Sequence, residues 1–215
     1  AEDGCGYDPI EMTGHYVGDV FEQLNAMWSG RCWPSLAIFH PDCTNLTNSA
    51  AWAFNDPDFV RYPGVGYHQR VKPGTLVGAA RRAAREKALD DVRRIFALPI
   101  RRKVIENPVG AISTAIRKPS QIVQPYDFGD DASKGTCLWY AGKDGEPLPE
   151  MRLGRNPDLY VAPRFVNGLP RWGNQTDSGQ NRLSPGDDRW KERSRTYPGI
   201  AAAMVQHWHH FIDME

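Results

Sequence analysis

The chain has 215 residues, a length that predicts one domain whose core is stable without a disulfide or a metal ion. Its 4 cysteines show no C-x-x-C spacing, which excludes a zinc ribbon and a thioredoxin-type site, and no apolar run approaches the ~18–20 residues that cross a bilayer. With 26 Lys+Arg against 26 Asp+Glu and few cysteines, the sequence predicts a cytoplasmic protein without a membrane partner.

The balanced charge is unevenly distributed along the chain. Residues 1–60 hold 1 basic and 9 acidic residues, residues 61–118 hold 14 and 4, and residues 119–215 hold 11 and 13. A basic segment in a neutral protein is typical of contact with a polyanion, and the alternative is a solvated helix face.

The first predicted element is a short buried strand at residues 36–39, an apolar run between two prolines. The prolines and glycines of residues 54–74 predict a long loop. A helix is predicted over residues 75–96, with its apolar face on the sheet and its arginines in solvent. The predicted apolar face consists of Leu76, Ala80, Ala84, Ala88, Val92 and Phe96.

Two further strands are predicted at residues 103–105 and 136–140, and a helix that begins at Pro198 closes the chain. Its apolar face consists of Ile200, Met204, Trp208 and Phe211. Residues 142–195 show no clear period and predict a long irregular insertion. Strands separated by long connections predict an α/β fold, a mostly parallel sheet flanked by helices, in a single domain over residues 1–215.

Polar residues follow two of the predicted strands. Residues 40–44 read His-Pro-Asp-Cys-Thr, and residues 106–108 read Glu-Asn-Pro. Because ligands of open α/β sheets bind beyond the carboxyl ends of the strands, we expect Cys43 and Glu106 to face one pocket. A thiol beside a carboxylate predicts nucleophilic chemistry, and the alternatives are a buried inert thiol and a carboxylate that caps a helix.

Several segments occur in the order of a known set of motifs. They are Gly-Asp-Val at residues 18–20, Pro-Asp-Cys at 41–43, Glu-Asn-Pro at 106–108, Lys-Gly-Thr-Cys-Leu-Trp at 134–139 and Gly-Ile-Ala-Ala-Ala at 199–203. In this order, over residues 14–208, the chain resembles the DNA cytosine-5 methyltransferases. It looks closest to the short methyltransferase-like proteins of phages and prophages.

The resemblance implies a Rossmann-like, methyltransferase-type fold, DNA as substrate and S-adenosylmethionine as cofactor, bound through Asp19, Pro41 and Asn107. It implies that the Cys43 thiolate adds to carbon 6 of a flipped cytosine, while Glu106 hydrogen-bonds the ring nitrogen 3 and the exocyclic amine. The candidate DNA-binding residues are Arg81, Arg85, Lys134, Asn174, Arg193 and Arg195.

The chain departs from the family in two places. Residues 41–44 read Pro-Asp-Cys-Thr where the family has Pro-Pro-Cys-Gln, which places an acid beside the thiol. No strand with a glycine-rich cofactor loop precedes Gly18, so we expect weak or absent binding of S-adenosylmethionine. The alternatives are a catalytically lapsed DNA-binding or restriction-blocking protein and, ranked last, an amino-group methyltransferase.

Three other features stay open at this stage. His207 and His210 lie one helical turn apart, yet no carboxylate follows at ligand spacing, so we predict no metal site. The amide-rich residues 174–181 are typical either of contact with base edges or of a solvated loop. Trp172 and Trp190 are suited either to stacking on bases or to anchoring this loop to the core.

Overall fold

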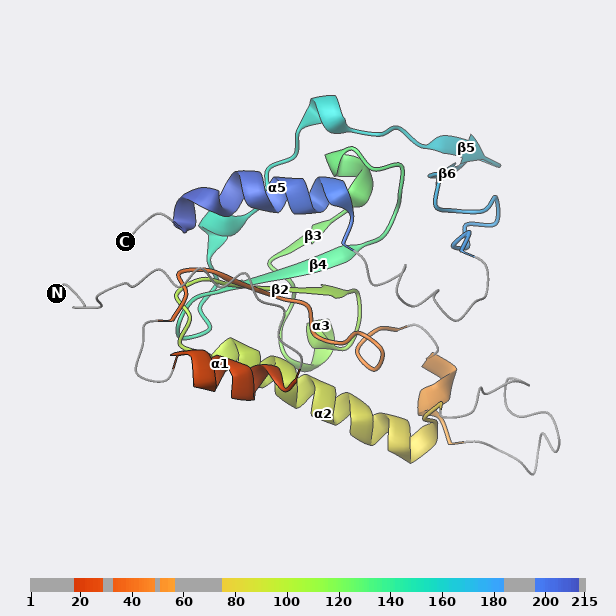
Figure 1. The fold of residues 1–215 in the computed structure, drawn as a ribbon. Helices are drawn as coiled ribbons and strands as arrows, with labels where there is room; N and C mark the ends of the chain where they lie inside the picture. Colours follow the sequence, from red (N-terminus) through yellow and green to blue (C-terminus); the bar gives the residue numbers. More distant parts are fainter. Residues whose placement is uncertain (1–17, 29–32, 49–50, 57–74, 184–195, 213–215) are drawn as a thin grey trace.

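A four-stranded sheet lies between two layers of helices in the computed structural model (Figure 1). The structure describes residues 18–28, 33–48, 51–56, 75–183 and 196–212. The strands are β1 (Ala37–Phe39), β2 (Lys103–Pro108), β3 (Gln121–Val123) and β4 (Thr136–Ala141), in the spatial order β1-β2-β4-β3. Helices α1 (Val20–Trp28), α2 (Gly78–Ala97) and α3 (Ile112–Ala115) lie on one face, and α5 (Pro198–Trp208) lies on the other.

The prediction of a Rossmann-like, mostly parallel sheet is wrong. Only β1 and β2 pair in parallel, whereas β4 pairs antiparallel with both β2 and β3. A parallel crossover normally contains a helix that returns the chain across the sheet. Residues 124–135, which join β3 to β4, contain only the single turn η2 (Pro125–Phe128), and the chain therefore returns beside β3 in the opposite direction.

The core is divided by the sheet into two apolar clusters, and β4 contributes to both. Cys137 and Trp139 point to the α1 and α2 side, while Leu138 and Tyr140 point to the α5 side. This alternation buries every residue of β4, which explains why its residues after Thr136 are all apolar or aromatic.

Helix α2 is rotated from its predicted orientation over its first half. Ala80 is exposed, and Arg81 is only 7% exposed, so the prediction that the arginines lie in solvent is wrong for Arg81. Leu89, Val92 and Ile95 make the apolar contact farther along the helix.

Helix α5 confirms its prediction. It begins at Pro198, and its four predicted apolar residues are at most 6% exposed. The indole Nε1 of Trp208 donates to the Met151 carbonyl at 2.9 Å. The η3 turn (Pro149–Met151) is thereby tied to the helix.

The segment predicted as an irregular insertion contains a hairpin. Strands β5 (Arg164–Val166) and β6 (Leu169–Arg171) pair antiparallel. Asn167 and Gly168 join them with φ of 52° and 75°, the conformation that a two-residue hairpin turn requires. Short turns η1 (Ala51–Phe54), η4 (Pro157–Leu159) and η5 (His209–Phe211) complete the described elements.

Trp172 anchors the segment after the hairpin to the body of the protein. Its ring stacks on Tyr126 with the centroids 4.1 Å apart, and its Nε1 donates to the Val161 carbonyl at 2.9 Å. Of the two roles left open for Trp172, the structure shows the anchoring one.

Within the part of the chain that the structure describes, no helix is long and apolar enough to cross a membrane.

Candidate functional site

The parallel pair β1 and β2 brings the two predicted polar clusters to one edge of the sheet. Phe39 pairs with Ile105, so the residues that follow, His40 and Glu106, are neighbours. The His40 Nδ1 lies 3.0 Å from the Glu106 Oε2. The Glu106 side chain is 10% exposed and the His40 side chain 48%, so the imidazole stands between the buried carboxylate and solvent.

The loop that carries Cys43 is held against β2 by backbone and side-chain bonds. The Asn107 Nδ2 donates to the Pro41 carbonyl at 2.8 Å, and the Ala111 N–H donates to the Leu46 carbonyl at 2.7 Å. The Cys43 carbonyl accepts the N–H groups of Leu46 and Thr47 at 3.1 and 3.0 Å. The loop is therefore a closed turn at a fixed position relative to Glu106.

Two arginines of α2 hold the same loop from the other side. The Arg81 Nη2 donates to the Thr44 carbonyl at 3.1 Å. The Arg85 Nε donates to the Asn45 carbonyl at 2.7 Å, and both guanidinium groups lie over the Phe54 ring. These two residues were predicted to bind DNA. In the structure their guanidinium groups position the loop that carries Cys43.

The environment of Cys43 favours the neutral thiol. Burial raises the pKa of the thiol most, and the negative charge of Asp42 raises it further. The charge of Lys134 lowers the pKa of the thiol, and the charge of Glu106 raises it. The sulfur therefore responds to three charged groups, those of Asp42, Lys134 and Glu106. The neutral thiol is therefore the favoured form, and formation of the thiolate needs a base to accept the proton.

We predict that Asp42→Asn lowers the pKa of the Cys43 thiol and speeds its alkylation by iodoacetamide at pH 7.5. The substitution removes a charge that raises the pKa, while the amide oxygen still accepts from the Thr44 N–H and Oγ, as the Asp42 Oδ1 does at 2.9 and 2.6 Å. The rate is measured against pH with Cys5 and Cys32 replaced by serine.

Lys134→Gln serves as the matched control, because it removes the cation that lowers the same pKa. Alkylation should slow in this variant. Equal rates in Asp42→Asn and the parent would mean that Asp42 does not act on the sulfur.

The residues predicted to bind S-adenosylmethionine are engaged in local structure. The Asp19 Oδ1 accepts the N–H groups of Phe21 and Glu22 at 2.8 and 3.1 Å and caps α1. Asn107 is 1% exposed and donates to Pro41, which leaves only its buried carboxamide oxygen without a partner. These bonds hold Asp19 and Asn107 within the protein, and their contact with S-adenosylmethionine stays a prediction.

The other residues predicted to bind DNA do not lie together. Asn174 bonds both the N–H and the carbonyl of Ser133 at 3.0 Å, so its amide holds the loop rather than facing outward. Lys134 lies at the site edge, with its Nζ 5.9 Å from the centre of the Tyr197 ring. Arg193, Arg195 and Trp190 lie outside the described residues.

Among the described histidines, cysteines and carboxylates, no group could hold a metal ion.

A polar pocket of about 340 Å³ is lined by residues that sequence reasoning did not single out. Its arginines are Arg164, Arg171 and Arg182. The signal was present, because Asn167-Gly168 between two short β-prone runs is a strong hairpin pattern that would have paired Arg164 with Arg171.

Comparison of the chain with known protein families, with curated proteins and with solved structures finds no match.

Proposed function

We propose that this protein is a DNA base-modifying transferase that acts on cytosine through the Cys43 thiol. The observation that supports the proposal is the grouping of one thiol, one carboxylate–imidazole pair and one ammonium group at a single sheet edge. The thiol belongs to Cys43, the carboxylate–imidazole pair to Glu106 and His40, and the ammonium group to Lys134. A nucleophile beside a proton donor is the arrangement that addition to a pyrimidine ring needs.

The addition exchanges one bond for another without an outside reductant or oxidant. The Cys43 sulfur bonds to carbon 6, the thiol proton leaves to solvent, and the electron pair of the C5=C6 bond moves toward nitrogen 3. The His40–Glu106 pair supplies a proton to that nitrogen and regains one from solvent. Carbon 5 is then nucleophilic and takes up an electrophile, which without any other donor is a solvent proton. Loss of its original hydrogen, of the proton on nitrogen 3 and of the thiolate restores the aromatic ring, and the thiolate takes a proton back from solvent.

The base must leave the helical stack before Cys43 can reach it, so the substrate is a flipped or single-stranded cytosine. The resemblance names S-adenosylmethionine as the methyl donor. No step of the proposal depends on that donor.

The test uses the reversible addition alone. DNA of mixed sequence, single- and double-stranded, carries deuterium at carbon 5 of cytosine, and release of the label to water is measured without any methyl donor. While the sulfur is bonded, a solvent proton acts as the electrophile at carbon 5. We expect the parent protein to release the label and Cys43→Ser to release none, because a hydroxyl is a far poorer nucleophile at neutral pH.

Cys137→Ala is the matched control, since this second thiol is fully buried and takes no part in the proposed step. It should release label as the parent does. Release that survives Cys43→Ser, or no release by the parent, would overturn the proposal.

The second candidate is a non-catalytic DNA-binding or restriction-blocking protein. Two observations favour it: Asp42 raises the pKa of the thiol, and the predicted cofactor residues are engaged in local structure. It predicts DNA binding that is unchanged by Cys43→Ser and no release of label by any variant.

A further inference from the structure

Two arginines face each other across the β5–β6 hairpin. Arg164 and Arg171 are directly paired in the register, so their side chains leave the same face of a two-stranded sheet. Like charges in directly opposite positions destabilise a strand pair unless negative groups lie between them. This pairing therefore indicates a site built to hold negative charge.

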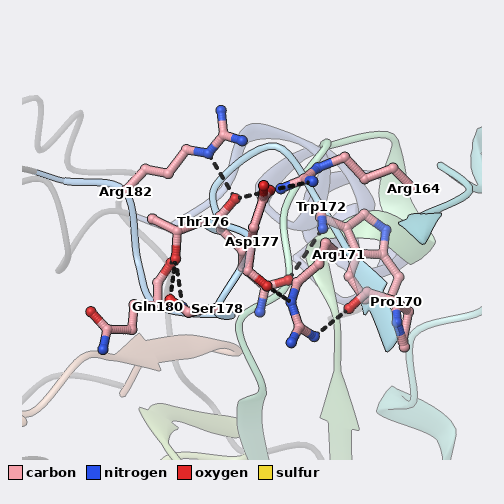
Figure 2. A network of polar contacts seen from close by, with 10 residues as sticks. Arg164, Pro170, Arg171, Trp172, Thr176, Asp177, Ser178, Gln180 and Arg182 are labelled. Carbon is pink, nitrogen blue, oxygen red and sulfur yellow. Dashed lines mark hydrogen bonds and ion pairs between the residues drawn. The ribbon is translucent and has the colours of Figure 1, made fainter. Parts of the chain in front are cut away.

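Acceptors of the protein itself bond some of the N–H groups of these arginines. Asp177 accepts from the Arg164 Nη1 at 2.7 Å, and the Asp177 carbonyl accepts from the Arg171 Nε at 3.1 Å. The Gln175 carbonyl accepts from Arg164 and from the Nε of Arg182 at 3.0 and 2.7 Å. Figure 2 shows the three arginines arranged around this turn.

Several guanidinium donors remain without an acceptor among the described residues. Arg182 uses only its Nε, which leaves both of its Nη groups, and Arg171 keeps its Nη2. All three arginines line the pocket of about 340 Å³, together with Asp131, Ala162 and Gly173. Three cations oppose two carboxylates there, Asp131 and Asp177, and the Asp131 Oδ1 already accepts the Gly173 N–H at 2.7 Å.

A short segment of chain links the pocket to a residue that acts on the Cys43 thiol. Asp131 lines the pocket, and Lys134, which acts on the Cys43 thiol, is only three residues farther along. Three residues span at most ~11 Å even when fully extended. The reciprocal bonds between Ser133 and Asn174 fix the intervening segment to the loop that follows the hairpin.

We propose that Arg164, Arg171 and Arg182 bind one phosphodiester of a nucleic-acid backbone beside the base that Cys43 addresses. Guanidinium forks match phosphate oxygens, and such contacts set the position of the strand relative to the site. The inference rests on DNA as the partner named in the proposed function, and it does not depend on the chemistry at Cys43.

The test is the affinity for a fluorescent single-stranded DNA, measured by anisotropy at several salt concentrations. Arg182→Gln is the main variant, because among the described residues the Arg182 side chain makes one hydrogen bond, and the substitution keeps the backbone bond to Asn174. We expect affinity to fall about five- to tenfold and the slope of log K against log salt to fall by about 1. Arg182→Lys keeps the charge and should recover most of the slope.

Arg93→Gln is the matched control, since it removes the same charge from α2, where Arg93 pairs with Asp90. An equal loss of affinity in Arg93→Gln and Arg182→Gln would show a general charge effect and overturn the proposal. Unchanged affinity for DNA in Arg182→Gln would also overturn the proposal. Deoxycytidine monophosphate and inorganic phosphate are titrated as competitors. Binding of either one at millimolar concentration, with no effect of Arg182→Gln on DNA, would assign the pocket to a free phosphate instead and overturn it as well.

The proposed function is judged separately by the release of label from carbon 5. Loss of DNA affinity in Arg182→Gln without any label release by the parent would keep this pocket and remove the catalytic role of Cys43. Label release with unchanged DNA affinity in Arg182→Gln would keep the catalytic role and remove the pocket.

Discussion

Replacing Gly110 by alanine should destabilise the protein by about 3 kcal/mol or more. A Cβ at this position would lie 2.0 Å from the Leu46 carbonyl oxygen and 2.9 Å from the Thr47 Cα. Both contacts are with backbone, which cannot rotate away as a flexible side chain does. The loop that carries Cys43 must move, and the bond from the Ala111 N–H to the Leu46 carbonyl must break. The measurement is the free energy of unfolding from denaturant titration.

Gly142→Ala is the control for this variant. Its added Cβ would meet nothing closer than 3.6 Å, so its effect should stay below about 1 kcal/mol. Gly110→Ala should also change the alkylation rate of Cys43, because the displaced loop carries the thiol, whereas Gly142→Ala should not. Similar unfolding free energies for the two variants would show that the Leu46 loop yields easily and is not fixed by β2.

Trp139→Ala should cost ~3–5 kcal/mol of unfolding free energy. Trp139 is fully buried at the centre of β4, within the cluster that packs α1 and α2 on the sheet. Its Nε1 donates to the Arg117 carbonyl at 2.8 Å, so truncation leaves both a cavity and an unpaired carbonyl. Thermal and denaturant unfolding measure the loss.

Trp139→Phe separates these two effects. The phenyl ring keeps most of the apolar contact and removes only the donor to Arg117, so we expect a loss of ~1–3 kcal/mol. Equal losses in the alanine and phenylalanine variants would mean that the hydrogen bond, not the packing, dominates at this position.

Periodicity predicted α2 and α5, but it did not predict which face of the first half of α2 is buried. Alanines at positions 80 and 84 suggested an apolar stripe, yet alanine contributes little to burial. Arg81 and Arg85 instead extend their apolar stems along the core and bring their guanidinium groups to loop carbonyls. Such partners lie 37 to 40 residues away in the chain, where a local pattern carries no information.

Strand direction was the other property that local sequence could not supply. The residues of β4 are buried on both faces, a pattern usual for parallel strands, yet the strand runs antiparallel to its neighbours. The pairing of β3 with β4 depends on three residues, Gln121–Val123, too few to show a period. The proximity of Glu106 to the residues after β1 was predictable, because it depends only on two strands ending at one edge.

The edges of the sheet have a consequence for how the protein behaves at high concentration. Both edge strands, β1 and β3, are three residues long, while the six-residue strands β2 and β4 occupy the centre. An edge strand recruits another chain through its row of unpaired N–H and carbonyl groups, and a row of three residues offers few of them. Among the described strands, β1 and β3 each shield the three residues of the long strand with which they pair, and strand addition there must first detach β1 or β3.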